Sequence, residues 1–271
     1  MRKDLTTGSV WKTVLSFSLP YFLSYFLQTL YGMADLFIIG QFEGVASTTA
    51  VSVGSQVMHM LTVMIVGLAM GSTVSIGQAV GARDMKRAAR SIGNTATLFL
   101  GLSLVLTVLL LLLVRPIVSV MPTPEAEVAG TVDYLTICFV GIPFITAYNI
   151  ISSIFRGLGD SKSPMYFIAV ACIANIALDY LFMGTLHMGP SGAALGTTLS
   201  QTISVLLSLV VITARKSDLS IRRSDLCPAW PVMKQILSVG IPVALQDGFT
   251  SGPWTCPCLR SPPFWRIGTS G

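Results

Sequence analysis

Residues 98–114 read LFLGLSLVLTVLLLLLV, a stretch without a single charged side chain. A helix needs about 20 predominantly apolar residues to cross the hydrocarbon core of a bilayer. Of the chain's 271 residues, 52% are hydrophobic and only 11% are charged, whereas soluble domains carry about 25% charged residues. Because similar apolar stretches recur along the chain, we predict an all-α membrane protein rather than a soluble one.

Six apolar stretches predict a bundle of six transmembrane helices. Their predicted bounds are residues 14–39, 47–80, 92–114, 132–155, 165–183 and 191–214. The second stretch is too long for one straight span, so we expect it to tilt or to project into water. Gly67, Gly71, Gly77 and Gly81 recur along it, and small residues at such intervals favour close helix contact in lipid.

Basic residues alternate between the two ends of the predicted bundle. Lys and Arg precede the first span, join the second to the third and the fourth to the fifth, and follow the sixth. The other three loops contain only Arg115 together with several acids. The positive-inside rule therefore predicts a cytoplasmic N-terminus in a multi-pass protein of the plasma membrane. These loops account for the net charge of +5, so the expected partner is the lipid bilayer and not nucleic acid.

A short repeat indicates how the chain is organised. KTVLSFSLP at residues 12–20 recurs as KQILSVGIP at 234–242, so a segment like the first span begins again after six spans, as in repeats related by an axis along the membrane normal. Four Pro crowd the last twenty residues, where they cannot complete a span, so we expect out-of-frame or foreign sequence there. The predicted units are a six-helix bundle (1–214), a cytoplasmic basic linker (215–234), the start of a second bundle (235–249) and an aberrant tail (250–271).

Two acidic residues stand out because charge inside a membrane is costly and usually functional. Asp35 and Asp179 are the only acids deep inside the six predicted spans, and no Lys or Arg lies within these spans. Helical rise places both about 7 Å inside the outer end of the bundle. Asn175 lies one turn from Asp179, and Thr197 lies at a similar depth. These oxygens suit a hard cation such as sodium, and carboxylates in a low dielectric can also hold protons.

Other polar residues are candidates for lining a cavity. Tyr31 and Gln28 lie one and two turns from Asp35, and Asn149 lies in the fourth span; the alternative for each is an interhelical hydrogen bond. Pro20 is a candidate hinge in the first span, or a static kink. The two His are isolated, and we find no nucleophile triad or phosphate loop. The sequence therefore predicts no enzyme, no cofactor and no metal site beyond the sodium ion.

Several segments resemble the multidrug and toxic compound extrusion (MATE) family. The resemblance covers residues 1 to about 249, and the segments stand in the family's order. They are PYFLS (20–24), MADLFIIG (33–40), GQAVGARD (77–84), FRGLGDSKSP (155–164), NIALDYLF (175–182) and GAALGTTLSQ (192–201).

This resemblance implies the N-terminal half of a twelve-helix antiporter that exports cationic or amphipathic drugs against sodium or proton entry. It also implies a cation site made of Asp35, Asn175, Asp179 and Thr197. The second six-helix bundle is absent, so we expect no transport unless that bundle is supplied in trans. Two alternatives stay open: an exporter of a lipid-linked sugar or metabolite with the same fold, and a membrane bundle that does not transport.

Overall fold

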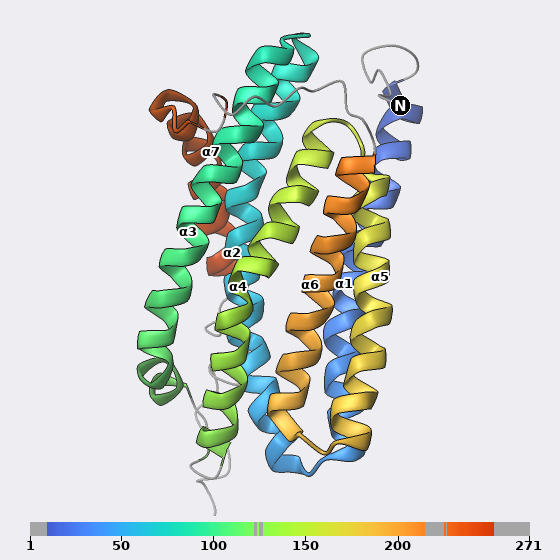
Figure 1. Cartoon of the computed structure of the whole chain (residues 1–271), viewed down its shortest axis with the longest axis vertical. Helices are drawn as coiled ribbons and strands as arrows, with labels where there is room; N and C mark the ends of the chain where they lie inside the picture. The colour runs from blue at the N-terminus through green and yellow to red at the C-terminus, as the bar shows by residue number, and fades with distance from the viewer. Residues whose placement is uncertain (1–9, 122–123, 125–126, 215–224, 226, 252–271) are drawn as a thin grey trace, which may run out of the picture.

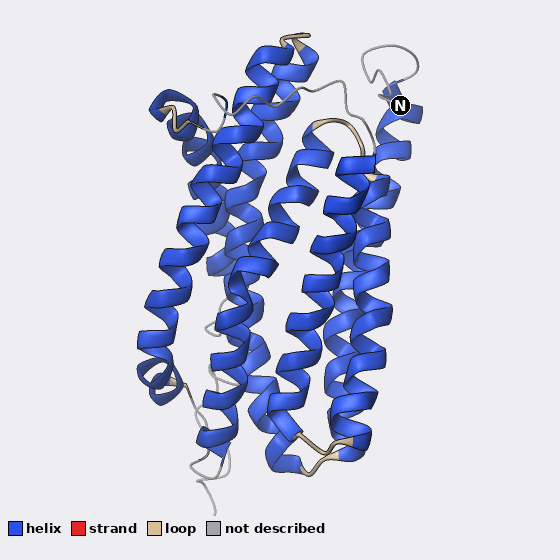
Figure 2. Cartoon of the chain, viewed as in Figure 1, coloured by secondary structure: helices blue, strands red, loops and turns tan. Residues whose placement is uncertain are grey.

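The computed structural model describes residues 10–121, 124, 127–214, 225 and 227–251. Within these residues every regular element is a helix, and short loops join the helices (Figure 2). The prediction of an all-α protein is therefore confirmed for this part of the chain. The predicted tail lies outside the described residues from 252 onward.

Six helices are long enough and apolar enough to span a membrane, and a seventh helix follows them. The elements are α1 (Val10–Phe42), α2 (Val45–Gly81), α3 (Met85–Val120), α4 (Val128–Gly157), α5 (Lys162–Asp179), the π-helix η2 (Tyr180–Thr185), α6 (Gly189–Ala214) and α7 (Trp230–Ser251). This confirms the prediction of six spans and the start of a seventh.

The helices are longer than the apolar stretches that predicted them, because polar residues continue each helix at its ends. α3 begins at Met85, although its apolar run begins at Ile92. The Asp84 side chain accepts a hydrogen bond from the Arg87 N–H at 2.9 Å and so caps the first turn. α2 is unbroken over 37 residues, or about 55 Å, which exceeds the hydrocarbon core of a bilayer as expected.

α4 stands at the centre of the bundle (Figure 1). It packs against α2 and α3 on one side and against α6 on the other. α1 and α5 lie beyond α6 and pack against each other, while α7 lies against α2. The site residues predicted on α1, α5 and α6 therefore lie on three helices that are neighbours in space.

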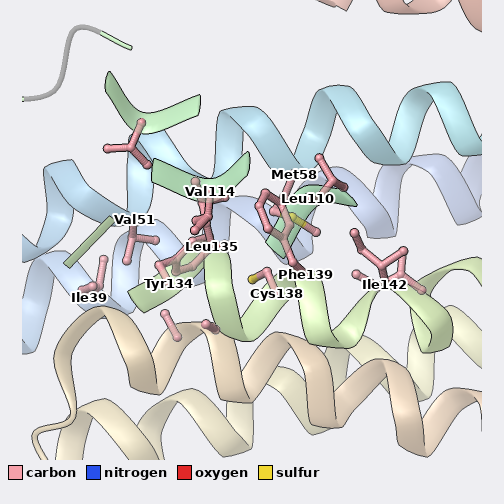
Figure 3. Packing of buried hydrophobic residues seen from close by; sticks show 14 of the residues in the cluster. Ile39, Val51, Met58, Leu110, Val114, Tyr134, Leu135, Cys138, Phe139 and Ile142 are labelled. Atoms are coloured by element: carbon pink, nitrogen blue, oxygen red, sulfur yellow. The ribbon is translucent and has the colours of Figure 1, made fainter. Parts of the chain in front are cut away.

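A large apolar cluster surrounds α4 (Figure 3). Leu135, Phe139 and Ile142 are at most 1% exposed, and side chains such as Met58 of α2 and Leu110 of α3 pack on them. Between membrane-spanning helices, close van der Waals packing of this kind stabilises the contact, since transfer from water contributes little there. This cluster fixes α2, α3 and α4 relative to one another.

The outward faces of the bundle are apolar as well. On α3, Leu100, Leu104 and Leu112 are 62%, 54% and 75% exposed. Soluble proteins rarely expose a contiguous apolar surface of this kind. The exposed leucines are therefore placed to contact lipid chains.

α7 packs on α2 through residues without side chains. A Cβ atom at Gly71 would collide with the carbonyl oxygen of Ile236, and one at Gly67 would lie 2.6 Å from the Cα atom of Ala244. Gly240 of α7 approaches α2 equally closely, with a Cβ position 2.5 Å from the Leu68 carbonyl oxygen. Two of the four glycines predicted to serve close helix contact thus do so against α7, whereas Gly81 has no neighbour within 4 Å of its Cβ position.

Polar side chains hold the start of α7. The Asn94 Oδ1 atom accepts a hydrogen bond from the Ala229 N–H at 2.6 Å. Gln235 donates to Gln78 at 3.3 Å and accepts from Arg87 at 3.4 Å. α7 begins at Trp230, within the range predicted as a linker, because these contacts and the glycine packing extend the helix toward its N-terminus.

We predict that Gly71→Ala destabilises the chain. The added methyl group must push α7 away from α2, and overpacking of this kind costs about 1–3 kcal/mol. The matched control is Gly101→Ala on α3, whose Cβ position has no neighbour within 4 Å. Thermal unfolding of the purified variants in detergent would test this, and a Gly71→Ala variant as stable as the control would contradict it.

Candidate cation site and adjoining cavity

Asp35 of α1 contacts α6. Its side chain is only 6% exposed, and its Oδ2 atom accepts a hydrogen bond from the Thr197 hydroxyl at 3.2 Å. The other carboxylate oxygen, Oδ1, has no hydrogen-bond partner in the described part of the chain. The Oδ1 atom of Asp35 is therefore available for a further interaction.

Asp179 and Asn175 lie one turn apart at the end of α5, and both are 0% exposed. Both side chains lie close enough to interact with the carboxylate of Asp35. Neither carboxylate oxygen of Asp179 and neither polar atom of the Asn175 amide has a hydrogen-bond partner among the described residues. The structure thus brings together all four side chains of the predicted site.

The cluster leaves more buried polar atoms unpaired than proteins normally tolerate. Five of them belong to Asp35, Asn175 and Asp179, and four of the five are oxygens. More than nine-tenths of buried polar groups are hydrogen-bonded in native proteins, and an unpaired buried charge costs several kcal/mol. A proton shared between the carboxylates, or a hard cation bound by these oxygens, would satisfy them.

Gly196 makes room for Asp179 against α6. A Cβ atom at this position would collide with the Asp179 Oδ1 atom and would lie 3.7 Å from the Asn175 Nδ2 atom. Any larger residue would therefore separate α6 from the carboxylate. Gly196 lies directly before Thr197 in a glycine-rich segment, but no sequence pattern predicts its closeness to Asp179.

The helix changes its hydrogen-bonding pattern immediately after Asp179. α5 ends at this residue and continues as the π-helix η2, from Tyr180 to Thr185. Such π-segments are rare and occur frequently at functional sites. No periodicity in the apolar residues indicates this change, so the sequence predicted a uniform span here.

Tyr31 connects the cluster to a neighbouring turn of α6. Its hydroxyl group lies 3.4 Å from both the Thr197 carbonyl oxygen and the Ser200 hydroxyl. Tyr31 therefore forms the interhelical hydrogen bonds that were one alternative for it, and it also lines a cavity as the other alternative required.

A cavity of about 580 Å³ lies between α1, α2, α4, α6 and α7. The predicted lining residues Gln28, Tyr31 and Asn149 all border it. Asp35 and Thr197 border it too, whereas Asn175 and Asp179 are not among its lining residues. The cluster therefore faces the cavity through Asp35 and extends behind it into the packed interior.

Aromatic rings form part of the walls of this cavity. Its lining includes five tyrosines, namely Tyr21, Tyr25, Tyr31, Tyr134 and Tyr148. His59 of α2 and Asp247 of α7 also border it, although no pattern in the sequence places them together. A pattern on one helix cannot show which residues of other helices face it.

Pro20 lies inside α1 and is buried. The helix continues through it, and the Ser24 hydroxyl donates to the Pro20 carbonyl oxygen at 2.8 Å. Pro20 does not border the cavity, but the next residue, Tyr21, does. Its role as a hinge stays a prediction.

Comparison with known proteins identifies related chains. Residues 20–181 match the MatE family model. The chain is 35% identical to the probable multidrug resistance protein YpnP of Bacillus subtilis, over 90% of this chain and 54% of that protein. It is 30% identical to the probable multidrug resistance protein NorM of Thermotoga maritima, over 87% of this chain and 51% of that protein. The chain thus spans about half the length of these relatives.

Solved structures show the same arrangement. A MOP superfamily transporter from Pyrococcus furiosus superposes with a TM-score of 0.83 at 28% identity, over 90% of this chain and 54% of that one. The inward-facing conformation of a multidrug resistance MATE family transporter gives a TM-score of 0.77 at 28% identity, over 83% of this chain and 51% of that one. The family model, the relatives and the folds agree, and the chain belongs to the MatE family of multidrug and toxic compound extrusion transporters.

Proposed function

We propose that this chain is the first half of a cation-coupled multidrug efflux antiporter, with Asp35, Asn175, Asp179 and Thr197 as its coupling site. The observation that carries the proposal is the set of unpaired buried oxygens that meets a cavity through Asp35. The names of the relatives, which are multidrug resistance proteins, support drugs as the substrates.

Two ions fit this coupling site. The paired carboxylates of Asp35 and Asp179 could share a proton, since two buried like charges in contact cannot both ionise freely. The neutral oxygens of Asn175 and Thr197 favour sodium, because they add ligands that a proton does not need. Apart from this coupling ion, we propose no metal and no cofactor.

The position of Asp35 offers a route for coupling. One face of the residue borders the cavity, while the other interacts with Asp179 behind it. A cationic drug in the cavity would be attracted by the same carboxylate that the coupling ion needs. The tyrosine rings of the cavity add favourable faces for cations and for flat apolar groups.

A complete transporter needs a second bundle, which the remaining half of the relatives' length can supply. α7 repeats the sequence character of α1 and would be the first helix of that bundle. We propose that the 271-residue chain does not transport by itself, and that a partner providing the second bundle in trans would complete the path.

A second candidate function keeps the fold and changes the substrate. Arg156 borders the cavity, and a cation there favours substrates with phosphate or carboxylate groups. An exporter of a lipid-linked sugar or a metabolite would use the same cavity in this way. Uptake of labelled candidates by vesicles that contain a full-length relative would distinguish this function from drug efflux.

We further propose that the basic end of the bundle faces the cytoplasm, in the plasma membrane. The junctions α2–α3 and α4–α5 lie at the same end as the start of α1 (Figure 1). Arg83, Arg87 and Lys162 lie at these junctions, whereas Glu43 and Asp133 lie near the opposite end. Basic loops are retained on the cytoplasmic side during insertion.

We predict that Asp35→Asn combined with Asp179→Asn abolishes ion binding. Sodium should raise the unfolding temperature of the unmodified chain, or acid should do so if the ion is a proton. A ligand at one hundred times its Kd stabilises by about 2.7 kcal/mol. The double variant should lose this shift, and the control Asp133→Asn should retain it, because Asp133 is an exposed acid outside the cluster.

Thermal unfolding over a series of sodium concentrations and pH values measures both effects. An equal ion-dependent shift in the double variant would rule out this coupling site. The same two substitutions in a full-length relative should abolish efflux while expression is unchanged.

We predict that vesicles containing only this chain show no ion-driven efflux of a cationic dye. The reason is that the proposed drug path lies between two bundles. Sustained efflux from such vesicles would contradict the prediction when crosslinking shows the chain to be monomeric. Crosslinked dimers with efflux would instead indicate that a second copy completes the path.

We predict that Arg87→Cys is protected from a membrane-impermeant maleimide in intact cells. The background is a chain whose five native Cys are replaced by Ser. Asp133→Cys, near the opposite end of the bundle, is the matched control and should react. Ready labelling at position 87 before the cells are permeabilised would reverse the proposed orientation.

A further inference from the structure

Arg156 brings a positive charge to the wall of the cavity that Asp35 also borders. It lies in the last turn of α4, with its Cζ atom 5.3 Å from the centre of the Tyr21 ring. Its Nε–H group donates to the Ser152 carbonyl oxygen at 3.2 Å. The aromatic ring and this hydrogen bond hold the guanidinium group at the cavity wall.

No acidic residue pairs with this guanidinium in the described part of the chain. Asp160, the nearest acid in sequence, accepts hydrogen bonds from the backbone N–H groups of Lys162 and Ser163 and from the Ser163 hydroxyl. It therefore caps the start of α5, and it does not border the cavity. The charge of Arg156 is not neutralised by a neighbour within the cavity.

The two acids that do border the cavity lie far from Arg156. Tyr21 and Asp35 are separated by fourteen residues of α1, which corresponds to about 21 Å along the helix. Asp247 lies on α7 about 25 Å from the start of that helix at Trp230. Hence the cavity carries a cation near one end and carboxylates deeper inside, with tyrosine rings between them.

Hydroxyl groups complete the surroundings of Arg156. The Ser152 side chain is 4% exposed and borders the cavity, and its Oγ atom has no hydrogen-bond partner among the described residues. Ser161 borders the same end of the cavity and is 5% exposed. An unpaired buried hydroxyl beside a half-buried guanidinium is a donor set that suits an oxyanion.

We propose that Arg156, supported by Tyr21 and Ser152, binds the phosphate or carboxylate group of an amphiphile at this end of the cavity. A guanidinium group binds such oxyanions with two parallel hydrogen bonds. Arg156 is close to the end of its helix, at a depth where the headgroups of lipids and of lipid-like substrates lie. The apolar part of the ligand would extend along the tyrosine-lined walls.

This proposal does not depend on the coupling site or on transport. It adds a second recognition element, so the cavity would accept zwitterionic and anionic amphiphiles in addition to cations. Binding can be measured on the purified 271-residue chain without an ion gradient. A failure of the proposed efflux function would therefore leave the outcome of this test unaffected.

The test measures binding of dodecyl phosphate to the chain in dodecyl maltoside, by isothermal titration or ligand-induced thermal stabilisation. Arg156→Gln should weaken binding by roughly ten- to a hundredfold, since a charge-assisted hydrogen bond contributes about 1.5–3 kcal/mol. Arg115→Gln, an exposed Arg on α3 far from the cavity, is the matched control and should bind as the unmodified chain does.

A second probe separates charge recognition from loss of structure. Binding of dodecyltrimethylammonium should not weaken in Arg156→Gln, because this probe has the opposite charge. Equal weakening for both probes, or unchanged dodecyl phosphate binding in Arg156→Gln, would overturn the proposal. If Arg156→Gln does not fold, Arg156→Lys and Ser152→Ala replace it, and full affinity in both of them would overturn it too.

Competition by inorganic phosphate identifies the source of the oxyanion. Displacement of dodecyl phosphate by millimolar phosphate would support a site that recognises the free anion. Binding of dodecyl phosphate that inorganic phosphate does not displace would support a site for a headgroup whose alkyl chain contributes to affinity. In either case, the binding of dodecyl phosphate must still be weaker in Arg156→Gln.

Discussion

Two carboxylates buried next to each other constrain the packing of α1, α5 and α6. Asp35 and Asp179 cannot both remain charged and unpaired in a low-dielectric interior without a cost of several kcal/mol per ion. The surrounding residues reduce this cost only in part: Thr197 donates one hydrogen bond to Asp35, and Gly196 lets α6 approach Asp179. The remaining oxygens have no hydrogen-bond partner among the described residues, and the coupling ion proposed above would supply their missing interactions.

The sequence predicted the helices and the depth of the site, because both follow from regular geometry. Long apolar stretches define spans, and a rise of about 1.5 Å per residue places Asp35 and Asp179 at one level. The rotation of each helix about its axis does not follow from the sequence in this way. The closeness of Gly196 to Asp179, and of Arg156 to Tyr21, depends on that rotation. The π-helix after Asp179 also lacks a signature in the apolar pattern, and the helix ends extend into polar residues that a hydropathy criterion leaves out.

The cavity is not uniformly apolar. Its charged groups lie at separate depths, with aromatic rings along the wall between them. Rings of this kind contact apolar and cationic groups without demanding one geometry, whereas Asp35 and Arg156 each demand a charge of one sign. Broad acceptance along the walls and charge selection at two points can therefore coexist in one cavity, and the two properties can be changed separately by substitution.

The seating of α7 on α2 has a consequence for how such a protein can be divided. By sequence, the border between the repeats falls in the linker before α7. By packing, α7 belongs with the preceding helices, because Gly67 and Gly71 allow backbone-to-backbone contact with it and Asn94 holds its start. A cut at the sequence border would leave this strip of α2 facing lipid with no partner shaped to fill it. The smallest piece that buries its own contact surfaces here has seven helices, and a complementary piece produced separately would begin with the helix that follows α7.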